Sequence, residues 1–152
     1  MRVLVVEDEP LIAFMNQQIL VGAGHEVVGP VASVAAALRL AQDNRIDLAL
    51  LDINLGRGGN GVELARCLHH QHGIPSVFTS GSTTAARCGR DVALGLLSKP
   101  YSSNDLLLAV AWVDALLSGA KLARVPARME VFARRAAGEQ GAVRRASSDP
   151  RC

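Results

Sequence analysis

Short apolar runs alternate along most of the chain with longer segments in which apolar residues recur at helical spacing. Turn residues bound each of the apolar runs, which cover residues 2–6, 25–31, 46–52, 75–80 and 94–98. Continuous apolar runs of this length are typical of strands that are buried on both faces of a parallel sheet. The pattern therefore predicts five parallel strands.

Helices are predicted between successive strands and after the last one, and several carry a recognisable start. Pro10 suits the first turn of a helix, where no backbone amide donor is needed. Ser33 is the expected N-cap of the second helix and Asn60 that of the third. Ser102 and Asp105 have the spacing of a capping box at the start of the last helix.

Strands that alternate with helices indicate an α/β fold, a doubly wound five-stranded parallel sheet with helices on both faces and right-handed crossovers. We expect the flavodoxin-like strand order 2-1-3-4-5, in which the first and third strands are neighbours. In such sheets ligands bind at the carboxyl ends of the strands, where the strand order reverses. A functional site is therefore expected at that edge of the sheet.

The composition favours an intracellular globular protein. No apolar run reaches the ~18 residues needed to cross a bilayer, and the run after Met1 and Arg2 is too short for the apolar core of a signal peptide. The three cysteines form no Cys-x-x-Cys pair, which favours reduced thiols over a disulfide framework. We therefore expect a cytoplasmic protein without a membrane span.

Charge divides the chain into an acidic domain, residues 1–118, and a basic extension, residues 119–152. The first part carries 8 basic and 11 acidic residues, a net charge of −3, and the second 8 basic and 3 acidic residues, a net charge of +5. Within the extension a helix is predicted from Pro126 through Ala137, with a disordered remainder.

The role of the extension is left open by its sequence. It is short for a DNA-binding domain and lacks a helix-turn-helix pattern, so nucleic acid is not the expected partner. Three readings remain: a solvated extension, a segment that docks to a partner or joins two copies in a homodimer, and weak electrostatic contact with nucleic acid or a membrane surface.

Polar residues stand at the carboxyl ends of four predicted strands. Glu7 and Asp8 follow the first strand, Asp52 ends the third, Ser80 ends the fourth and Lys99 follows the fifth. Three carboxylates brought together repel one another unless a hard cation such as Mg²⁺ neutralises them. A hydroxyl and an ammonium nearby would bind the oxygens of a phosphoryl group held by a carboxylate.

With these residues, the chain over about residues 1–118 resembles the receiver domain of two-component response regulators. The resemblance implies that Asp52 is the phospho-accepting aspartate and that Glu7 and Asp8 are the acidic pair of a Mg²⁺ site. It also implies that Asn54, two residues after Asp52, gives its backbone carbonyl to the metal.

The resemblance extends to the residues expected to bind the phosphoryl group. Ser80 matches the hydroxyl residue that moves toward the phosphate, and Lys99 matches the family's lysine, usually joined by a cis bond to a proline, here Pro100. The chain departs from the family at Leu96, where an aromatic switch residue is common, and in the short, poorly patterned fourth helix, residues 82–91. We therefore expect a buried Leu96 and a switch that acts mainly through Ser80.

The function implied is that of a stand-alone phospho-aspartate switch and not an enzyme, beyond slow autophosphorylation and autodephosphorylation. A sensor histidine kinase or a histidine phosphotransfer protein would phosphorylate Asp52, and the downstream target would be another protein. One alternative is a pseudo-receiver that binds partners without carrying phosphate. A second, an aspartate-nucleophile phosphatase, needs another acid two residues after the nucleophile, where Asn54 stands instead.

Overall fold

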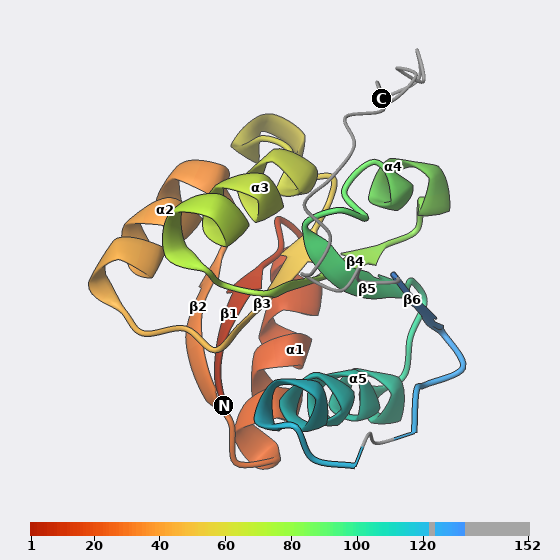
Figure 1. Ribbon diagram of the computed structural model, residues 1–152. Coiled ribbons are helices and arrows are strands. Elements are labelled where there is room, and N and C mark those ends of the chain that lie inside the picture. Colours follow the sequence, from red (N-terminus) through yellow and green to blue (C-terminus); the bar gives the residue numbers. More distant parts are fainter. Residues whose placement is uncertain (122–123, 133–152) are drawn as a thin grey trace, which may run out of the picture.

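A six-stranded sheet forms the centre of the computed structural model, which describes residues 1–121 and 124–132 (Figure 1). The strand order is β2-β1-β3-β4-β5-β6, and the first five strands of the chain run parallel to one another. These five are β1 (Arg2–Val6), β2 (Glu26–Val31), β3 (Leu48–Asp52), β4 (Ser76–Ser80) and β5 (Ala93–Ser98). The predicted α/β class and the 2-1-3-4-5 order are confirmed.

Helices cover both faces of the sheet, so the protein has three layers (Figure 1). One face carries α1 (Pro10–Gly22) and α5 (Ser103–Ser118), and the other α2 (Val34–Asp43), α3 (Gly61–His72) and α4 (Thr83–Arg87). A 3₁₀ turn, η1 (Gly56–Gly58), precedes α3. The central strands, which are covered on both faces, are buried: every residue of β3 and β4 is inaccessible or nearly so, whereas the edge strand β2 buries Val28 alone.

The predicted helix starts are confirmed by their hydrogen bonds. The hydroxyl of Ser33 accepts from the amide of Ala36, and the side-chain oxygen of Asn60 accepts from the amide of Val62 at 2.7 Å. Ser102 and Asp105 form the reciprocal capping box at the start of α5. α5 therefore has a fixed beginning a few residues after the end of β5.

α4 is the shortest α-helix in the described part of the chain, and its sequence pattern predicts a short helix. It has five residues, and Ala86 is the buried one among them. The turns that follow lead directly into β5. With little apolar surface in contact with the sheet, this helix has less to hold it in place than α3, which buries five residues.

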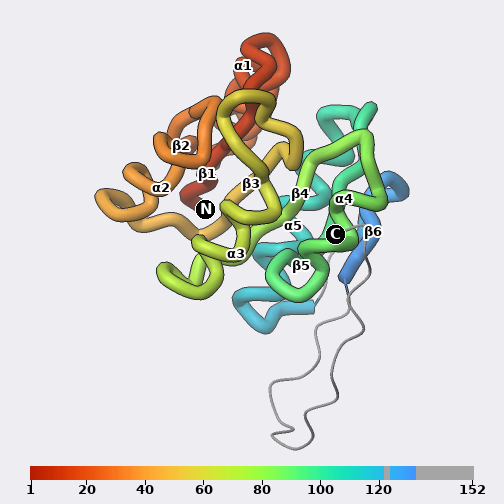
Figure 2. Tube along the Cα trace, turned by 90° about the horizontal axis from the view of Figure 1, so that it is seen from above, coloured from red at the N-terminus to blue at the C-terminus, as the bar shows by residue number. Residues whose placement is uncertain are grey.

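A sixth strand, β6 (Met129–Val131), comes from the basic extension and pairs antiparallel with β5. The helix predicted to begin at Pro126 is therefore wrong over these residues, and its predicted remainder, 133–137, lies outside the described residues. The physical reason is the free edge of β5, which offers unpaired backbone groups to an extended segment. Figure 2 shows β6 beside α4, on the side of the molecule away from α2 and β2.

Two further predictions from composition can be compared with the structure. Cys67 has a free thiol, in agreement with the expectation of reduced thiols at that position. Among the helices of residues 1–121 and 124–132, none has the length and apolar character needed to cross a membrane.

Candidate functional site

Three carboxylates meet at the carboxyl ends of β1 and β3, which are neighbouring parallel strands. Asp52 is the last residue of β3, while Glu7 and Asp8 follow β1 directly. One oxygen of each carboxylate lies within 4.8 Å of the others. Glu7 and Asp52 are buried, 3% and 7% exposed, and Asp8 faces solvent. The strand order thus brings together the acids that the sequence predicts for a cation site.

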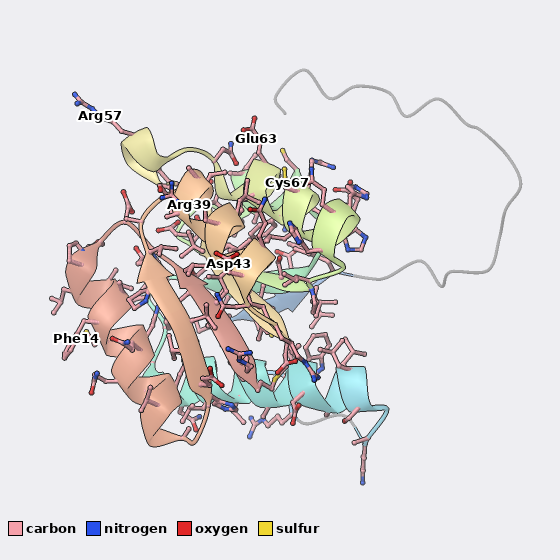
Figure 3. The ribbon with its side chains drawn as sticks, turned by 90° about the vertical axis from the view of Figure 1, so that its left-hand side faces the viewer. Phe14, Arg39, Asp43, Arg57, Glu63 and Cys67 are labelled. Carbon is pink, nitrogen blue, oxygen red and sulfur yellow. The ribbon has the colours of Figure 1, made fainter. Side chains whose placement is uncertain are left out.

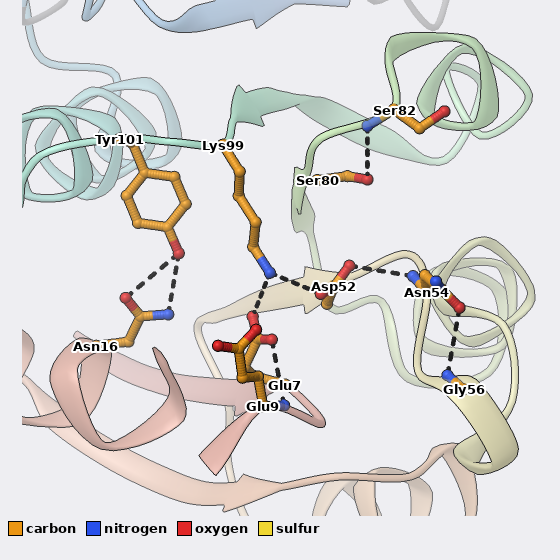
Figure 4. A network of polar contacts seen from close by, with 10 residues as sticks. All are labelled: Glu7, Glu9, Asn16, Asp52, Asn54, Gly56, Ser80, Ser82, Lys99 and Tyr101. Carbon is orange, nitrogen blue, oxygen red and sulfur yellow. Dashed lines mark hydrogen bonds and ion pairs between the residues drawn. The ribbon is translucent and has the colours of Figure 1, made fainter. Parts of the chain in front are cut away.

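Lys99 approaches the same carboxylates from β5, on the other side of β4 (Figure 4). Its Nζ lies 2.7 Å from Oδ2 of Asp52 and 2.8 Å from Oε2 of Glu7. The peptide bond to Pro100 is cis, as the resemblance implies. Lys99 therefore offsets part of the negative charge of the cluster.

Burial and pairing shift the pKa values of this cluster. Burial raises the pKa of Glu7 above its ordinary 4.5, although the hydrogen bond from Lys99 opposes the shift. Burial alone would lower the pKa of Lys99. Its hydrogen bonds to Asp52 and Glu7 outweigh burial, so the pKa of Lys99 lies above its ordinary 10.5. The ammonium is therefore charged across the physiological range.

The loop after β3 is held closely against Asp52. The amide of Asn54 donates to Oδ1 of Asp52 at 3.0 Å, and the Asn54 side chain accepts from the amide of Gly56 at 3.3 Å (Figure 4). A Cβ on Gly61 would collide with the backbone of Asp52 and Ile53, so only glycine lets α3 begin this close to the strand end. Asn54 is thus beside the aspartate; the metal role of its carbonyl stays a prediction.

Ser80 ends β4 beside these residues and is 5% exposed. Its Oγ accepts a hydrogen bond from the amide of Ser82 at 3.1 Å, and Figure 4 shows the hydroxyl directed toward Ser82. The backbone carbonyl of Ser80 accepts from the amide of Lys99 at 3.0 Å. The side chain of Ser80 is therefore bonded to the residue that caps α4, and its backbone carbonyl is bonded to the amide of Lys99.

Two residues of the site, Asn16 and Tyr101, are not predicted from the sequence pattern. Asn16 is buried on α1, and its amide donates to the Tyr101 hydroxyl at 3.1 Å, which braces the segment after Lys99 (Figure 4). Burial raises the pKa of Tyr101. The available signals were a polar residue within an apolar helix and the chain's single tyrosine directly after Lys99-Pro100.

A protein-family profile described as the response regulator receiver domain matches residues 3–111. The chain belongs to this family. The receiver assignment made from the residues is confirmed, and with it a place in two-component signalling.

Similar proteins and structures agree with this assignment. The DNA-binding response regulator MtrA of Mycolicibacterium smegmatis is 34% identical over 116 residues, 72% of this chain and 48% of that protein. The phyllosphere-induced regulator PhyR of Methylorubrum extorquens is 30% identical over 112 residues, 72% of this chain and 42% of that protein. The chain thus spans about half the length of these curated relatives, or less.

The fold is also that of solved receivers. The CheY-like receiver domain protein of Methanospirillum hungatei aligns with a TM-score of 0.71 at 27% identity, over 78% of this chain and 97% of that one. The alignment with NtrX of Brucella abortus has the same TM-score at 28% identity but covers 28% of that chain. The receiver fold therefore occurs both as nearly the whole of a solved chain and as a small part of one.

Proposed function

We propose that this receiver domain is a phospho-aspartate switch in which Asp52 accepts a phosphoryl group from a phosphohistidine. The donor would be a sensor histidine kinase or a histidine phosphotransfer protein. The observation that carries the proposal is the position of Lys99 Nζ, which bonds Asp52 and Glu7 while Asp8 completes the acidic cluster. One edge of the sheet thus carries a carboxylate that can act as the nucleophile, an ammonium that can bind phosphoryl oxygens and further acids that can bind a metal.

The acidic cluster fits Mg²⁺. Three carboxylates face a single ammonium, and two of the three are buried, which leaves negative charge that a hard oxygen-binding cation would neutralise. The residues that would hold it are Asp8, Asp52 and the backbone carbonyl of Asn54, with Glu7 acting through a water molecule. When bound, Mg²⁺ supplies charge neutralisation at the equatorial oxygens of the phosphoryl group.

The residues of the chain then have distinct tasks in the transfer. A carboxylate oxygen of Asp52 forms a bond to phosphorus as the phosphorus–nitrogen bond of the phosphohistidine breaks, and the bonding pair stays on the imidazole nitrogen. The product is an acyl phosphate on Asp52. Lys99 exchanges its bond to the Asp52 carboxylate for one to a phosphoryl oxygen. Ser80 turns from the Ser82 amide and donates its hydroxyl proton in a hydrogen bond to another of these oxygens.

An apolar surface on α1, next to the acidic cluster, suits the approach of a protein donor. Leu11, Phe14 and Met15 are 65%, 56% and 50% exposed, and Figure 3 shows Phe14 directed outward from α1. Exposed apolar groups gathered this way mark interaction surfaces. Phe14→Ser should slow transfer from a phosphorylated histidine phosphotransfer protein yet leave labelling by acetyl phosphate unchanged; equal loss with both donors would contradict this surface.

Intact mass after incubation with acetyl phosphate and Mg²⁺ tests the proposal. The wild-type chain should gain one phosphoryl group, Asp52→Asn should gain none, and EDTA should block the wild-type reaction. Asp43→Asn is the matched control, because Asp43 is an exposed carboxylate at the end of α2 and should leave labelling intact. Undiminished labelling of Asp52→Asn would place the acceptor elsewhere, and an unlabelled wild-type chain would favour the pseudo-receiver.

A further inference from the structure

β6 covers the edge of β5 with residues that the receiver match, 3–111, does not include. The amide of Ser98 donates to the carbonyl of Arg128, and the amide of Phe132 donates to the carbonyl of Leu94, both at 2.9 Å. The segment 128–132 thus bonds to β5 at both ends. Figure 1 shows β6 alongside β5, at the edge of the sheet.

The side chains of this segment complete the core on both faces of the sheet. Met129, 8% exposed, joins the buried cluster that includes α5, and Phe132, 3% exposed, joins the one that includes Ala86 of α4. Leu96, which pairs with Glu130, belongs to the same cluster as Phe132 and has no exposed surface. The expectation that Leu96 is buried is confirmed, and β6 lies against it.

Gly95 lets the segment come this close. A Cβ at Gly95 would lie 2.6 Å from the carbonyl oxygen of Glu130 and 3.0 Å from the end of the Met129 side chain, and its nearest neighbours all belong to β6. A glycine within a strand commonly marks such a close approach of another backbone. A substitution at Gly95 therefore acts directly on β6, and none of its three nearest contacts belongs to the aspartate site.

β6 is tied to the two segments that hold the phosphoryl-binding residues. Ser98, whose amide bonds to Arg128, precedes Lys99, whose amide bonds to the Ser80 carbonyl. At the end of α4, Nε of Arg87 lies 3.3 Å from Oε1 of Glu130. A movement of α4 or of the end of β5 therefore changes the contacts that hold β6.

We propose that residues 128–132 form a cis-acting cover over the edge of β5 and that phosphoryl binding at Asp52 releases it. The inference rests on the proposed function, since its trigger is the phosphoryl group. The hydroxyl of Ser80 now accepts from the amide of Ser82. Its rotation toward Asp52 removes that bond and frees the start of α4, and the position of Arg87 opposite Glu130 changes with it.

Thermodynamic linkage between phosphoryl binding and the position of β6 explains why binding releases β6 and does not tighten it. The bonds between β6 and its neighbours belong to the arrangement in which Ser80 is directed toward Ser82, so a ligand that favours another arrangement weakens them. By reciprocity, loosening β6 by other means strengthens phosphoryl binding by the same factor. Release exposes the backbone groups of β5 and the apolar site filled by Phe132, a surface that fits an extended peptide segment.

Amide exchange measured by NMR on the full chain tests the release. Loading with acetyl phosphate and Mg²⁺, checked by intact mass, should speed exchange at Phe132 and Ser98 by about tenfold, as expected if the open population rises by that factor. The amide of Asp47, which bonds to Arg2 in the opposite half of the sheet, should not change. A loaded chain with unchanged Phe132 exchange would overturn the inference and leave the proposed function standing. A chain that takes no phosphoryl group would overturn both.

Gly95→Ala tests the reciprocal effect, that loosening β6 strengthens binding at Asp52, and it does so without the phosphoryl group. It should speed Phe132 exchange in the unloaded chain and tighten the binding of beryllium fluoride with Mg²⁺, a phosphoryl mimic, by the same factor. Gly22→Ala is the matched control, because nothing lies within 4 Å of a Cβ at Gly22. Faster exchange at Phe132 with unchanged affinity for the mimic would show that β6 and the site are not coupled.

The exposed ion pair between Arg87 of α4 and Glu130 of β6 tests, with a smaller perturbation, whether α4 connects the site to β6. Arg87→Glu and Glu130→Arg should each speed Phe132 exchange by roughly two- to fivefold, the range expected for one exposed ion pair, and the double swap should restore protection. Val131→Ala is the control on the same strand, because Val131 is 41% exposed. Equal exchange in the wild-type chain, the two single variants and the double swap would exclude α4 as the link and overturn the proposal.

Discussion

Lys99 and Asp52 are joined by the short bond from Nζ to Oδ2, at 2.7 Å, although they come from strands with β4 between them. The same ammonium also bonds Glu7. The group proposed to bind a phosphoryl oxygen is thus already held at the acceptor, where it keeps two buried carboxylates together. Its loss should therefore affect both the stability of the resting protein and the phosphorylated state.

Lys99→Met should destabilise the metal-free protein by roughly 1–3 kcal/mol, the cost of leaving buried acceptors without their donor. Methionine keeps the length of the side chain and removes the charge, so Glu7 and Asp52 lose their cation. Urea unfolding in EDTA gives the free energy. Lys121→Met is the control, because Lys121 is exposed. A Lys99 variant as stable as wild type would mean that the two bonds contribute nothing to folding.

The raised pKa of Glu7 predicts a pH dependence of known sign. The folded state holds the Glu7 proton more tightly than the unfolded chain does, so this residue's contribution to stability is present at low pH and is lost as pH rises from about 4.5 through the folded pKa. Glu7→Gln should remove that loss. The unfolding free energy of the variant relative to wild type should therefore increase between acid and neutral pH in EDTA. A constant difference would show that Glu7 titrates normally.

Mg²⁺ should stabilise the folded protein, because it relieves repulsion among Glu7, Asp8 and Asp52. Binding to the native state alone, at ~100-fold excess over Kd, adds about 2.7 kcal/mol. Asp8→Asn should lose most of this effect, yet without metal it should be at least as stable as wild type, since one of three clustered charges is gone. Melting temperature with Mg²⁺ and with EDTA is the measurement. A wild-type melting temperature that is the same with Mg²⁺ and with EDTA would favour the pseudo-receiver.

The arrangement of the first five strands could be predicted because it depends on local patterns and general rules of chain topology. Buried parallel strands are continuous apolar runs, and right-handed crossovers leave few possible orders. Once strands one and three are neighbours, Glu7 and Asp52 have to meet. The positions of the site residues therefore followed from the strand ends, before any contact was known.

The sixth strand could not be predicted because its signal is not local. Met129 and Phe132 are three residues apart, which fits one face of a helix as well as opposite faces of a strand, and Pro126 suits a helix start. The segment forms a strand and not a helix because Gly95 leaves space for it and the edge of β5 offers unpaired backbone groups. Asn16 and Tyr101 were missed for a similar reason, since only the packing of α1 against the segment after β5 makes them neighbours.

The segment between Ser80 and Gly95 should show the largest change in hydrogen exchange when the phosphoryl group binds. Its start is held by the Ser82–Ser80 bond, which has to break if the Ser80 hydroxyl is to reach the phosphate, and its helix buries Ala86 alone. Leu96 has no exposed surface and, unlike an aromatic residue with a hydroxyl, nothing to gain from an exposed rotamer. The signal should therefore pass through the loop and α4.

Exchange with and without beryllium fluoride and Mg²⁺ gives the measurement, with Asp52→Asn as the control that should show no change. Residues 80–95 should lose protection most, the amides that join β5 and β6 should follow, and α1 should change little. Because α4 drives the release of β6, a change confined to residues beyond Gly119 would contradict the proposed release. The basic extension would then respond to the phosphoryl group directly, by a route that bypasses Ser80.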